Sequence, residues 1–253
     1  MTKITILNTR PETSSQFTAK VFEDRGFAVI NLPCITISSI DNDNEVAHKL
    51  NQINTGDVVI FTSQHAVKFA YQIYPALTIN KDSTAICVGT KTSELLEQLT
   101  NADIWVPTQQ NSHGVIELLK NLKQLNNIKL ITAANGREKI QNYASSKSIS
   151  LEQINVYQRR CPTINHKLLK PIEQTKNLVV LATSVATINN LQQITSSKTW
   201  QHLQASTIAC ASNRIAHKAK NKGFKNIINT QSANPSIIAE KLNKIIINPT
   251  KIV

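Results

Sequence analysis

The feature that most constrains the fold of this chain is an internal repeat. Three segments recur with shifts of 121 to 123 residues: VVIFTSQHAV (58–67), ICVGTKTSELL (86–96) and NSHGVIELL (111–119) recur as VVLATSVATI (179–188), ACASNRIAHKA (209–219) and NPSIIAEKL (234–242). Each match is short, but a nearly constant shift over three segments is hard to produce by chance. The chain is therefore predicted to hold two copies of one β-α-β-α-β-α unit.

Short apolar runs alternate along the chain with stretches of helical periodicity. The runs are ITIL (4–7), VINL (29–32), VVIF (58–61), AICV (85–88), IKLI (128–131), VVLA (179–182), TIAC (207–210) and NIIN (226–229). Apolar strands separated by helices are typical of parallel sheets that helices cover on both faces. We therefore predict the α/β class, with two similar doubly wound parallel-sheet domains.

The first 35 residues have a counterpart at 128–157, so the chain has the order A, B, A′, B′. Sequential pairing would give domains A+B and A′+B′. Nested pairing would pack A on B′ and make B+A′ an inserted domain, with chain crossings near 34–40 and 157–164. Pro33 and Pro162 at these junctions favour nesting mildly, because proline interrupts strand ladders. The residues alone leave both pairings open.

Composition narrows the class of partner. The net charge of +12 suits an anionic partner, either nucleic acid or a small molecule with several carboxylates or phosphates. Only 5% of the residues are aromatic, which argues against a stacking platform for single-stranded nucleic acid. We expect the partner to be a small molecule and not nucleic acid.

Location and metal binding can be judged from the same composition. No run reaches the roughly 18 apolar residues of a membrane span, and the N-terminus does not resemble a signal peptide. The four cysteines are scattered without metal-ligand spacing, so we expect no metal site, no disulfide and a reducing cytoplasm. No interface patch is evident, and a monomer is expected.

Polar turns follow several of the expected strands. In open parallel sheets, ligands collect beyond the carboxyl ends of the strands, where helix N-termini present free N–H groups. The candidate anion-binding residues at such turns are Arg10, Thr62, Ser63, Thr92, Arg137, Thr183, Ser184 and Arg214. Each hydroxyl can equally serve only as a helix cap, and Arg137 only as a surface charge. The recurrence of these turns in both copies favours an anion-binding rim.

Several common catalytic motifs are absent. The chain has no Gly-x-Gly-x-x-Gly, no Gly-x-x-x-x-Gly-Lys-Ser/Thr and no Gly-x-Ser-x-Gly, so nothing supports a dinucleotide site, a triphosphate loop or a nucleophile elbow. The histidines form no readable Ser/His/Asp arrangement. An enzyme with this sequence needs little side-chain chemistry.

An ordered set of motifs resembles the uroporphyrinogen-III synthase family. The motifs are TRPE, GFAVINLP, FTSQHAVKFA, VGTKT, NGRE, VYQRR, ATS, SNRIAHKAKNKGF and NPSIIAEKL, and they span nearly the whole chain. The resemblance implies nested domains joined by a two-strand linker. Domain 1 would comprise 1–35 plus 163–253, and domain 2 would comprise 39–158.

The resemblance also implies a reaction. Hydroxymethylbilane, a linear tetrapyrrole with carboxylates on every ring, would lose water and cyclise with inversion of ring D, through an azafulvene and a spiro intermediate and without a cofactor. Tyr157 matches the family's tyrosine at the second crossing and is expected to protonate the departing hydroxide. The alternative is that Tyr157 only packs the hinge, which is the second crossing of the chain between the domains. Departures from the family pattern at 132–135 and at Ile215 weaken the transfer of roles to those positions.

A function of a different class remains as the alternative. A non-catalytic bilobed protein that closes on an anionic ligand would share the nested topology. A degraded active site would also look like the departures at 132–135 and Ile215.

Overall fold

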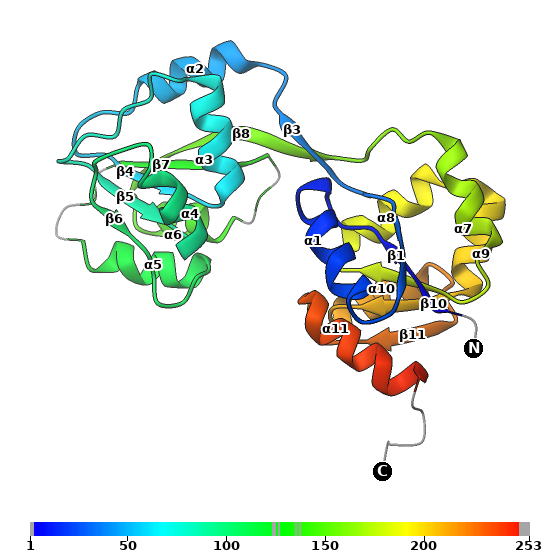
Figure 1. Ribbon diagram of the computed structural model, residues 1–253. Coiled ribbons are helices and arrows are strands. Elements are labelled where there is room, and N and C mark those ends of the chain that lie inside the picture. Colours follow the sequence, from blue (N-terminus) through cyan, green and yellow to red (C-terminus); the bar gives the residue numbers. More distant parts are fainter. Residues whose placement is uncertain (1–2, 123–124, 126, 135, 137, 248–253) are drawn as a thin grey trace. The chain divides into compact units, whose positions relative to one another are not determined.

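A computed structural model describes residues 3–122, 125, 127–134, 136 and 138–247 (Figure 1). The chain divides into two compact units, one formed by Met1–Thr36 with Arg160–Val253 and the other by Ile37–Arg159. Each unit contains one sheet, and the chain passes between the units twice. Among the described residues, no helix has both the length and the apolar character needed to cross a bilayer.

The sheet of the first unit has the order β11-β10-β9-β1-β2, and all its pairings are parallel. Its strands are β1 (Thr5–Asn8), β2 (Ala28–Asn31), β9 (Leu178–Ala182), β10 (Thr207–Cys210) and β11 (Asn226–Asn229). Strand β1, from the beginning of the chain, therefore lies beside β9 from its second half, with Ile6 opposite Val179.

Helices cover both faces of this sheet because the side chains of its strands alternate. Along β9, Leu178, Val180 and Ala182 belong to one buried cluster, and Val179 and Leu181 belong to another. The first cluster includes residues of α7 (Lys170–Gln174), α8 (Val185–Ile194), α9 (Ser197–Ala205) and α10 (Asn213–Asn221); the second includes residues of α1 (Glu12–Glu23) and α11 (Pro235–Leu242). The 3₁₀ helix η1 (His166–Leu169) precedes α7, and the π-helix η2 (Asn243–Ile247) follows α11.

The sheet of the second unit has the order β3-β8-β7-β4-β5-β6. Its strands are β3 (Thr36–Ser39), β4 (Val58–Phe61), β5 (Thr84–Cys87), β6 (Ile104–Trp105), β7 (Asn127–Ala133) and β8 (Ser150–Arg160). Strands β4 to β8 pair in parallel, and β3 lies beside β8 in Figure 1.

Alternation again separates two buried clusters in the second unit. Val59 and Phe61 of β4 face one cluster, and Val58 and Ile60 face the other. The first includes residues of α2 (Asp43–Asn51), α3 (Gln64–Ile73) and α4 (Thr90–Leu96); the second includes residues of α5 (Ser112–Lys120) and α6 (Lys139–Ser146).

The two sheets share one strand order, which is the structural form of the sequence repeat. Strands β4, β5 and β6 occupy the positions that β9, β10 and β11 occupy in the other unit, and β7 and β8 occupy those of β1 and β2. The predicted fold class is confirmed, including its nested pairing. The domain boundaries 1–35 plus 163–253 and 39–158 stay a prediction, because the contacts do not show that either unit folds alone.

Candidate functional site

The second unit collects most of its predicted site residues at one edge of its sheet. Strands β8, β7, β4 and β5 are neighbours, and the carboxyl ends of parallel strands meet at the same edge. Tyr157 lies near the end of β8, Thr62 and Ser63 follow β4, and Thr92 lies in α4 after β5. Arg137 lies outside the described residues.

A β-bulge determines where the Tyr157 side chain goes. The register between β7 and β8 shifts after Thr132, so that Ala133 pairs with Tyr157 and Val156 is the extra residue. Ile154, Val156 and Tyr157 all belong to the same buried cluster. Strict alternation would place Tyr157 on the opposite face from Val156, so the bulge turns the phenol toward α3.

Four side chains surround the phenol of Tyr157. Phe69 stacks on the ring with centroids 5.8 Å apart, and the His65 ring lies 5.7 Å away. Ser63 Oγ is 3.0 Å from the phenolic oxygen, and Arg159 Nη2 donates to that oxygen at 3.1 Å. The Arg159 guanidinium also lies 5.4 Å from the ring centroid. Tyr157 is only 1% exposed as a result.

Ser63 has a second role as the N-cap of α3. Its Oγ accepts a hydrogen bond from the Ala66 N–H at 3.2 Å, which satisfies one of the N–H groups left unpaired at a helix start. The cap therefore fixes the hydroxyl at the positive end of α3, next to the phenol.

His65, whose ring contacts Tyr157, is a poor source of protons near neutral pH. Burial, and then the charges of Lys68 and Arg159, lower the pKa of His65 below its usual value of 6.5. The imidazole is therefore mostly uncharged at neutral pH. His65 is therefore a weaker candidate than Tyr157 for the role of general acid.

Thr62 and Thr92 are placed by contacts within the unit. Thr62 Oγ1 donates to Thr132 Oγ1 at 2.9 Å, which ties the end of β4 to β7. Thr92 is 5% exposed and so presents little surface to a ligand. The start of α4 is covered by Gln110, whose Nε2 donates to Thr90 Oγ1 at 2.6 Å and whose Oε1 accepts from the Thr90 N–H at 3.3 Å. Sequence analysis missed Gln110, since it lies 20 residues from its partner.

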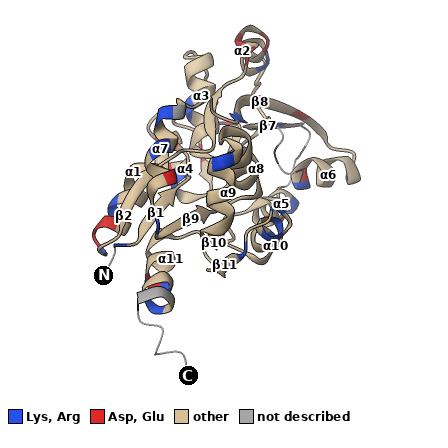
Figure 2. Cartoon of the chain, turned by 90° about the vertical axis from the view of Figure 1, so that its right-hand side faces the viewer, with Lys and Arg blue, Asp and Glu red and all other residues tan. Residues whose placement is uncertain are grey.

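The first unit places its predicted residues at the carboxyl ends of three neighbouring strands. Arg10 follows β1, Thr183 and Ser184 follow β9, and Arg214 lies in α10 after β10. Ser184 caps α8 by accepting from the Thr187 N–H at 3.1 Å. Arg214 is exposed on α10, one of many elements that carry Lys or Arg in Figure 2.

A buried amide, which sequence analysis missed, holds the turn that carries Arg10. The fully buried Asn8 donates to Asn31 Oδ1 at 2.8 Å and to the Ser15 carbonyl at 3.0 Å. Its own Oδ1 accepts from the Arg10 N–H at 3.4 Å. The Arg10 side chain is 3.5 Å from Thr18 Oγ1 and half-buried, and burial lowers the pKa of its guanidinium below the usual value. A guanidinium carries five N–H donors, more than this contact uses.

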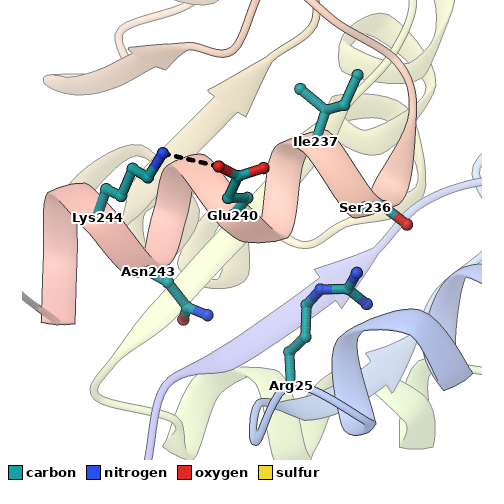
Figure 3. Close-up of a pocket in the computed structure, with 6 residues that line it drawn as sticks. All are labelled: Arg25, Ser236, Ile237, Glu240, Asn243 and Lys244. Atoms are coloured by element: carbon teal, nitrogen blue, oxygen red, sulfur yellow. Dashed lines mark hydrogen bonds and ion pairs between the residues drawn. The ribbon is translucent and has the colours of Figure 1, made fainter.

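Two hollows of the first unit involve none of the predicted residues. One, of about 320 Å³, is lined by Arg25, Ser236, Ile237, Glu240, Asn243 and Lys244. Figure 3 shows it beside α11, with the 2.7 Å ion pair between Lys244 and Glu240. The other, of about 250 Å³, is lined by residues 161–164, 193 and 194. Among the described residues, no cluster of His, Cys, Asp and Glu could hold a metal ion.

Residues 16–239 match the family model described as uroporphyrinogen-III synthase HemD. The chain belongs to the uroporphyrinogen-III synthase family. The resemblance found in the sequence motifs is thereby confirmed, and the chain is an enzyme of this family. These comparisons give no support to the non-catalytic binding protein.

Two relatives of the family agree with this assignment. The chain is 26% identical over 160 residues to a uroporphyrinogen-III synthase of Proteus mirabilis, covering 62% of this chain and 80% of the relative. It is 21% identical over 243 residues to the porphyrin biosynthesis protein HemD of Ruminiclostridium josui, covering 94% of this chain and 48% of the relative. The chain therefore spans about half the length of that second protein.

Solved structures of the family share the fold. A uroporphyrinogen-III synthetase from Helicobacter pylori has a TM-score of 0.63 at 11% identity, with 97% of this chain and all of that chain covered (100%). A mutant uroporphyrinogen III synthase from Thermus thermophilus has a TM-score of 0.56 at 11% identity, with 95% and 98% covered. At such low identity the likeness concerns the fold alone.

Proposed function

We propose that this chain closes hydroxymethylbilane to uroporphyrinogen III, with loss of water and inversion of ring D. The observation that carries the proposal is the match to the family model over residues 16–239. The cluster around Tyr157 supports it by supplying a proton donor at the carboxyl edge of a parallel sheet.

The proposed chemistry makes modest demands on side chains. A pyrrole nitrogen lone pair expels the hydroxyl group, which departs with the electrons of its C–O bond and needs a proton. Tyr157 is proposed as the source of that proton, a contribution of about 10²- to 10⁴-fold for a typical general acid. The resulting azafulvene is reactive, so most of the remaining work is to hold the chain ends in attack geometry. Control of that geometry also sets the isomer formed.

The carboxylates of the substrate require cations and N–H donors. We propose that the predicted residues Arg10, Thr62, Ser63, Thr183, Ser184 and Arg214 supply these groups after their strands, and that Arg137 supplies a further cation. Thr92, at 5% exposed, is left out of this proposal. Support comes from the caps at Ser63 and Ser184, which place hydroxyls at helix starts. Further support is the net charge of +12, which favours an anionic substrate.

The proposed setting is a monomer in the cytoplasm. All four cysteines are free, which suits a reducing compartment. The reaction needs no oxidant or reductant, because loss of water and ring closure leave the overall oxidation state unchanged.

Turnover distinguishes this proposal from a binding protein. The protein is mixed with freshly made hydroxymethylbilane in large molar excess, and the loss of the bilane is followed against a protein-free control. A synthase converts many equivalents at a rate proportional to protein concentration. Retention of no more than one equivalent, with the remainder closing at the control rate, would overturn the proposal.

A further inference from the structure

The contacts of Tyr157 also define a route for its proton. We infer that Ser63 delivers the proton to the leaving hydroxyl group, that Tyr157 restores the proton of Ser63, and that Arg159 positions the phenol and stabilises the charge it acquires. This inference deepens the proposed function and rests on it.

Burial rules out direct transfer in the conformation seen here. Tyr157 is 1% exposed, and both neighbours of its oxygen are protein groups, Ser63 Oγ at 3.0 Å and Arg159 Nη2 at 3.1 Å. A proton leaves a hydroxyl group along a hydrogen bond that the hydroxyl donates. A guanidinium only donates, so of these two neighbours Ser63 is the acceptor.

Because Ser63 accepts from the phenol, the hydrogen bonds among Arg159, Tyr157 and Ser63 run in one direction. Arg159 donates to Tyr157, and Tyr157 donates to Ser63. Ser63 Oγ also accepts from the Ala66 N–H at 3.2 Å. A serine oxygen has two acceptor lone pairs and one O–H. With both lone pairs engaged, the Ser63 O–H is the donor left for a substrate.

Two positive groups favour charge separation along this route. The Arg159 guanidinium contacts the phenolic oxygen and lies 5.4 Å from the ring centroid, so it stabilises the phenolate that forms. The N-terminus of α3, a helix of 10 residues, stabilises negative charge that passes through Ser63. The phenol itself is buried, which strengthens its interaction with the guanidinium, while Arg159 is exposed.

The relay balances in protons and electrons. The leaving hydroxyl takes the C–O electron pair and the Ser63 proton and becomes water. Ser63 takes the Tyr157 proton, and the electrons of that O–H bond stay on the phenolate beside Arg159. Ring closure later releases a proton from the pyrrole carbon that forms the new bond. The phenolate takes this proton back through Ser63, so the enzyme is regenerated.

The internal repeat shows that the helix cap does not by itself make a relay. Ser184 caps α8 as Ser63 caps α3, but the Ser184 hydroxyl is 2.9 Å from Thr187 Oγ1, within its own helix. The Ser63 hydroxyl instead contacts the phenol of Tyr157, which lies 94 residues away in the chain. The relay is thus a specialisation of one copy.

The relay is tested by single-turnover rates with freshly made hydroxymethylbilane. Ser63→Ala should slow closure by about 10- to 100-fold, and Ser63→Thr, which keeps a hydroxyl and a cap, should restore most of the rate. Ser196→Ala is the matched control. Ser196 caps α9 by the same bond, to the Thr199 N–H at 3.1 Å, but is not part of the site, so its variant should keep the wild-type rate.

Double variants and solvent isotope effects separate a relay from a structural role. Ser63→Ala combined with Tyr157→Phe should be no slower than the slower single variant, because both changes break one route. The closure rate is measured at several fractions of D₂O. A curved dependence, which indicates transfer of more than one proton, is expected for the wild type, and a linear dependence, which indicates one proton, is expected for Tyr157→Phe. Arg159→Gln should slow closure by about ten-fold, and Arg159→Lys should recover part of that loss.

The outcomes distinguish failure of the relay from failure of the proposed function. If Tyr157→Phe slows closure and Ser63→Ala does not, the relay is wrong and Tyr157 remains the acid. Additive effects of the two changes, or an unchanged isotope pattern, would also overturn the relay. If neither change slows closure, Tyr157 is not the acid. If the wild-type protein does not accelerate closure, the proposed function itself fails.

Discussion

At the scale of single residues, Tyr157→Phe removes the hydroxyl and keeps the ring between Phe69 and His65. We expect turnover to fall by about ten-fold or more, since a general acid typically contributes about 10²- to 10⁴-fold. The change also removes hydrogen bonds to Ser63 and Arg159, so unfolding in denaturant should show a loss of about 1–3 kcal/mol. Turnover equal to that of the wild type would mean that the phenol only packs the hinge.

His65 gives the protein a predicted sensitivity to acid. Its pKa in the folded state lies below the usual 6.5 because of burial and the charges of Lys68 and Arg159. The unfolded chain therefore binds more protons below that value, and the stability contributed by the neutral imidazole is present above pH 6.5 and lost as pH falls.

We expect His65→Gln to lose less stability than the wild type between about pH 7 and pH 5. Denaturant unfolding at several pH values measures the difference. Stability curves of the two proteins that run parallel over this range would contradict the assignment.

The sequence identified Tyr157 only through the family resemblance, and it did not reveal the groups around the hydroxyl. Ser63 is 94 residues from Tyr157 in the chain, and contacts at such separations depend on which strands become neighbours. Arg159, two residues from Tyr157, lies on the same face as the phenol once the direction of Tyr157 is set, because side chains alternate along a strand. The bulge at Val156 breaks the side-chain alternation of β8 and re-aims the phenol, and no residue pattern predicts it.

At the scale of elements, Gly114 in α5 is required by a close approach of the preceding loop. A Cβ at this position would collide with the Gln109 carbonyl and lie 2.9 Å from Pro107 Cβ. Gly114→Ala should lower the free energy of unfolding by about 1–3 kcal/mol, although alanine is favoured over glycine within helices by about 1 kcal/mol.

The repeat supplies the control for Gly114. Its counterpart in α11 is Ile237, which is exposed, so Ile237→Ala should change stability by about 0.5 kcal/mol or less. Denaturant midpoints measure both variants. A stable Gly114→Ala protein would show that the loop moves aside at little cost.

The apolar runs predicted eight strands, and all eight are present. Strand β8 was expected from the counterpart of the first 35 residues, and two further strands were missed for physical reasons. Strand β3 reads TISS and has an exposed or half-buried residue at every position, so it lacks the apolar signal of a buried strand. Strand β6 has only two residues, Ile104–Trp105. Both lie at sheet edges, where pairing with a neighbour determines the strand more than its own composition does.

At the scale of the whole molecule, the repeat predicted two like sheets but not which halves would combine. Strand β7 lies beside β4, and β1 lies beside β9, so the nested pairing is the one adopted. The residues could not decide this, because an A segment is compatible with either copy of B. Two prolines near the crossings gave only weak support.

We propose that the inserted unit folds by itself, in agreement with the predicted domain 39–158. Both of its hydrophobic clusters consist of residues from within Ile37–Arg159. A fragment of residues 37–159 should therefore unfold cooperatively and give a dispersed amide NMR spectrum. Residues 1–36 joined to 160–253 by a short flexible linker form the matching second fragment. A collapsed spectrum without cooperative unfolding for 37–159 would contradict independent folding.

The most direct test of the central claim is the isomer composition of the product. Freshly made hydroxymethylbilane is incubated with the protein, the product is oxidised, and the two uroporphyrin isomers are separated by chromatography. Uncatalysed closure gives the symmetric type I isomer. The enzyme should give type III, in a fraction that rises with protein concentration until it accounts for nearly all of the product. Type I alone, formed at the rate of the protein-free control, would contradict the assignment.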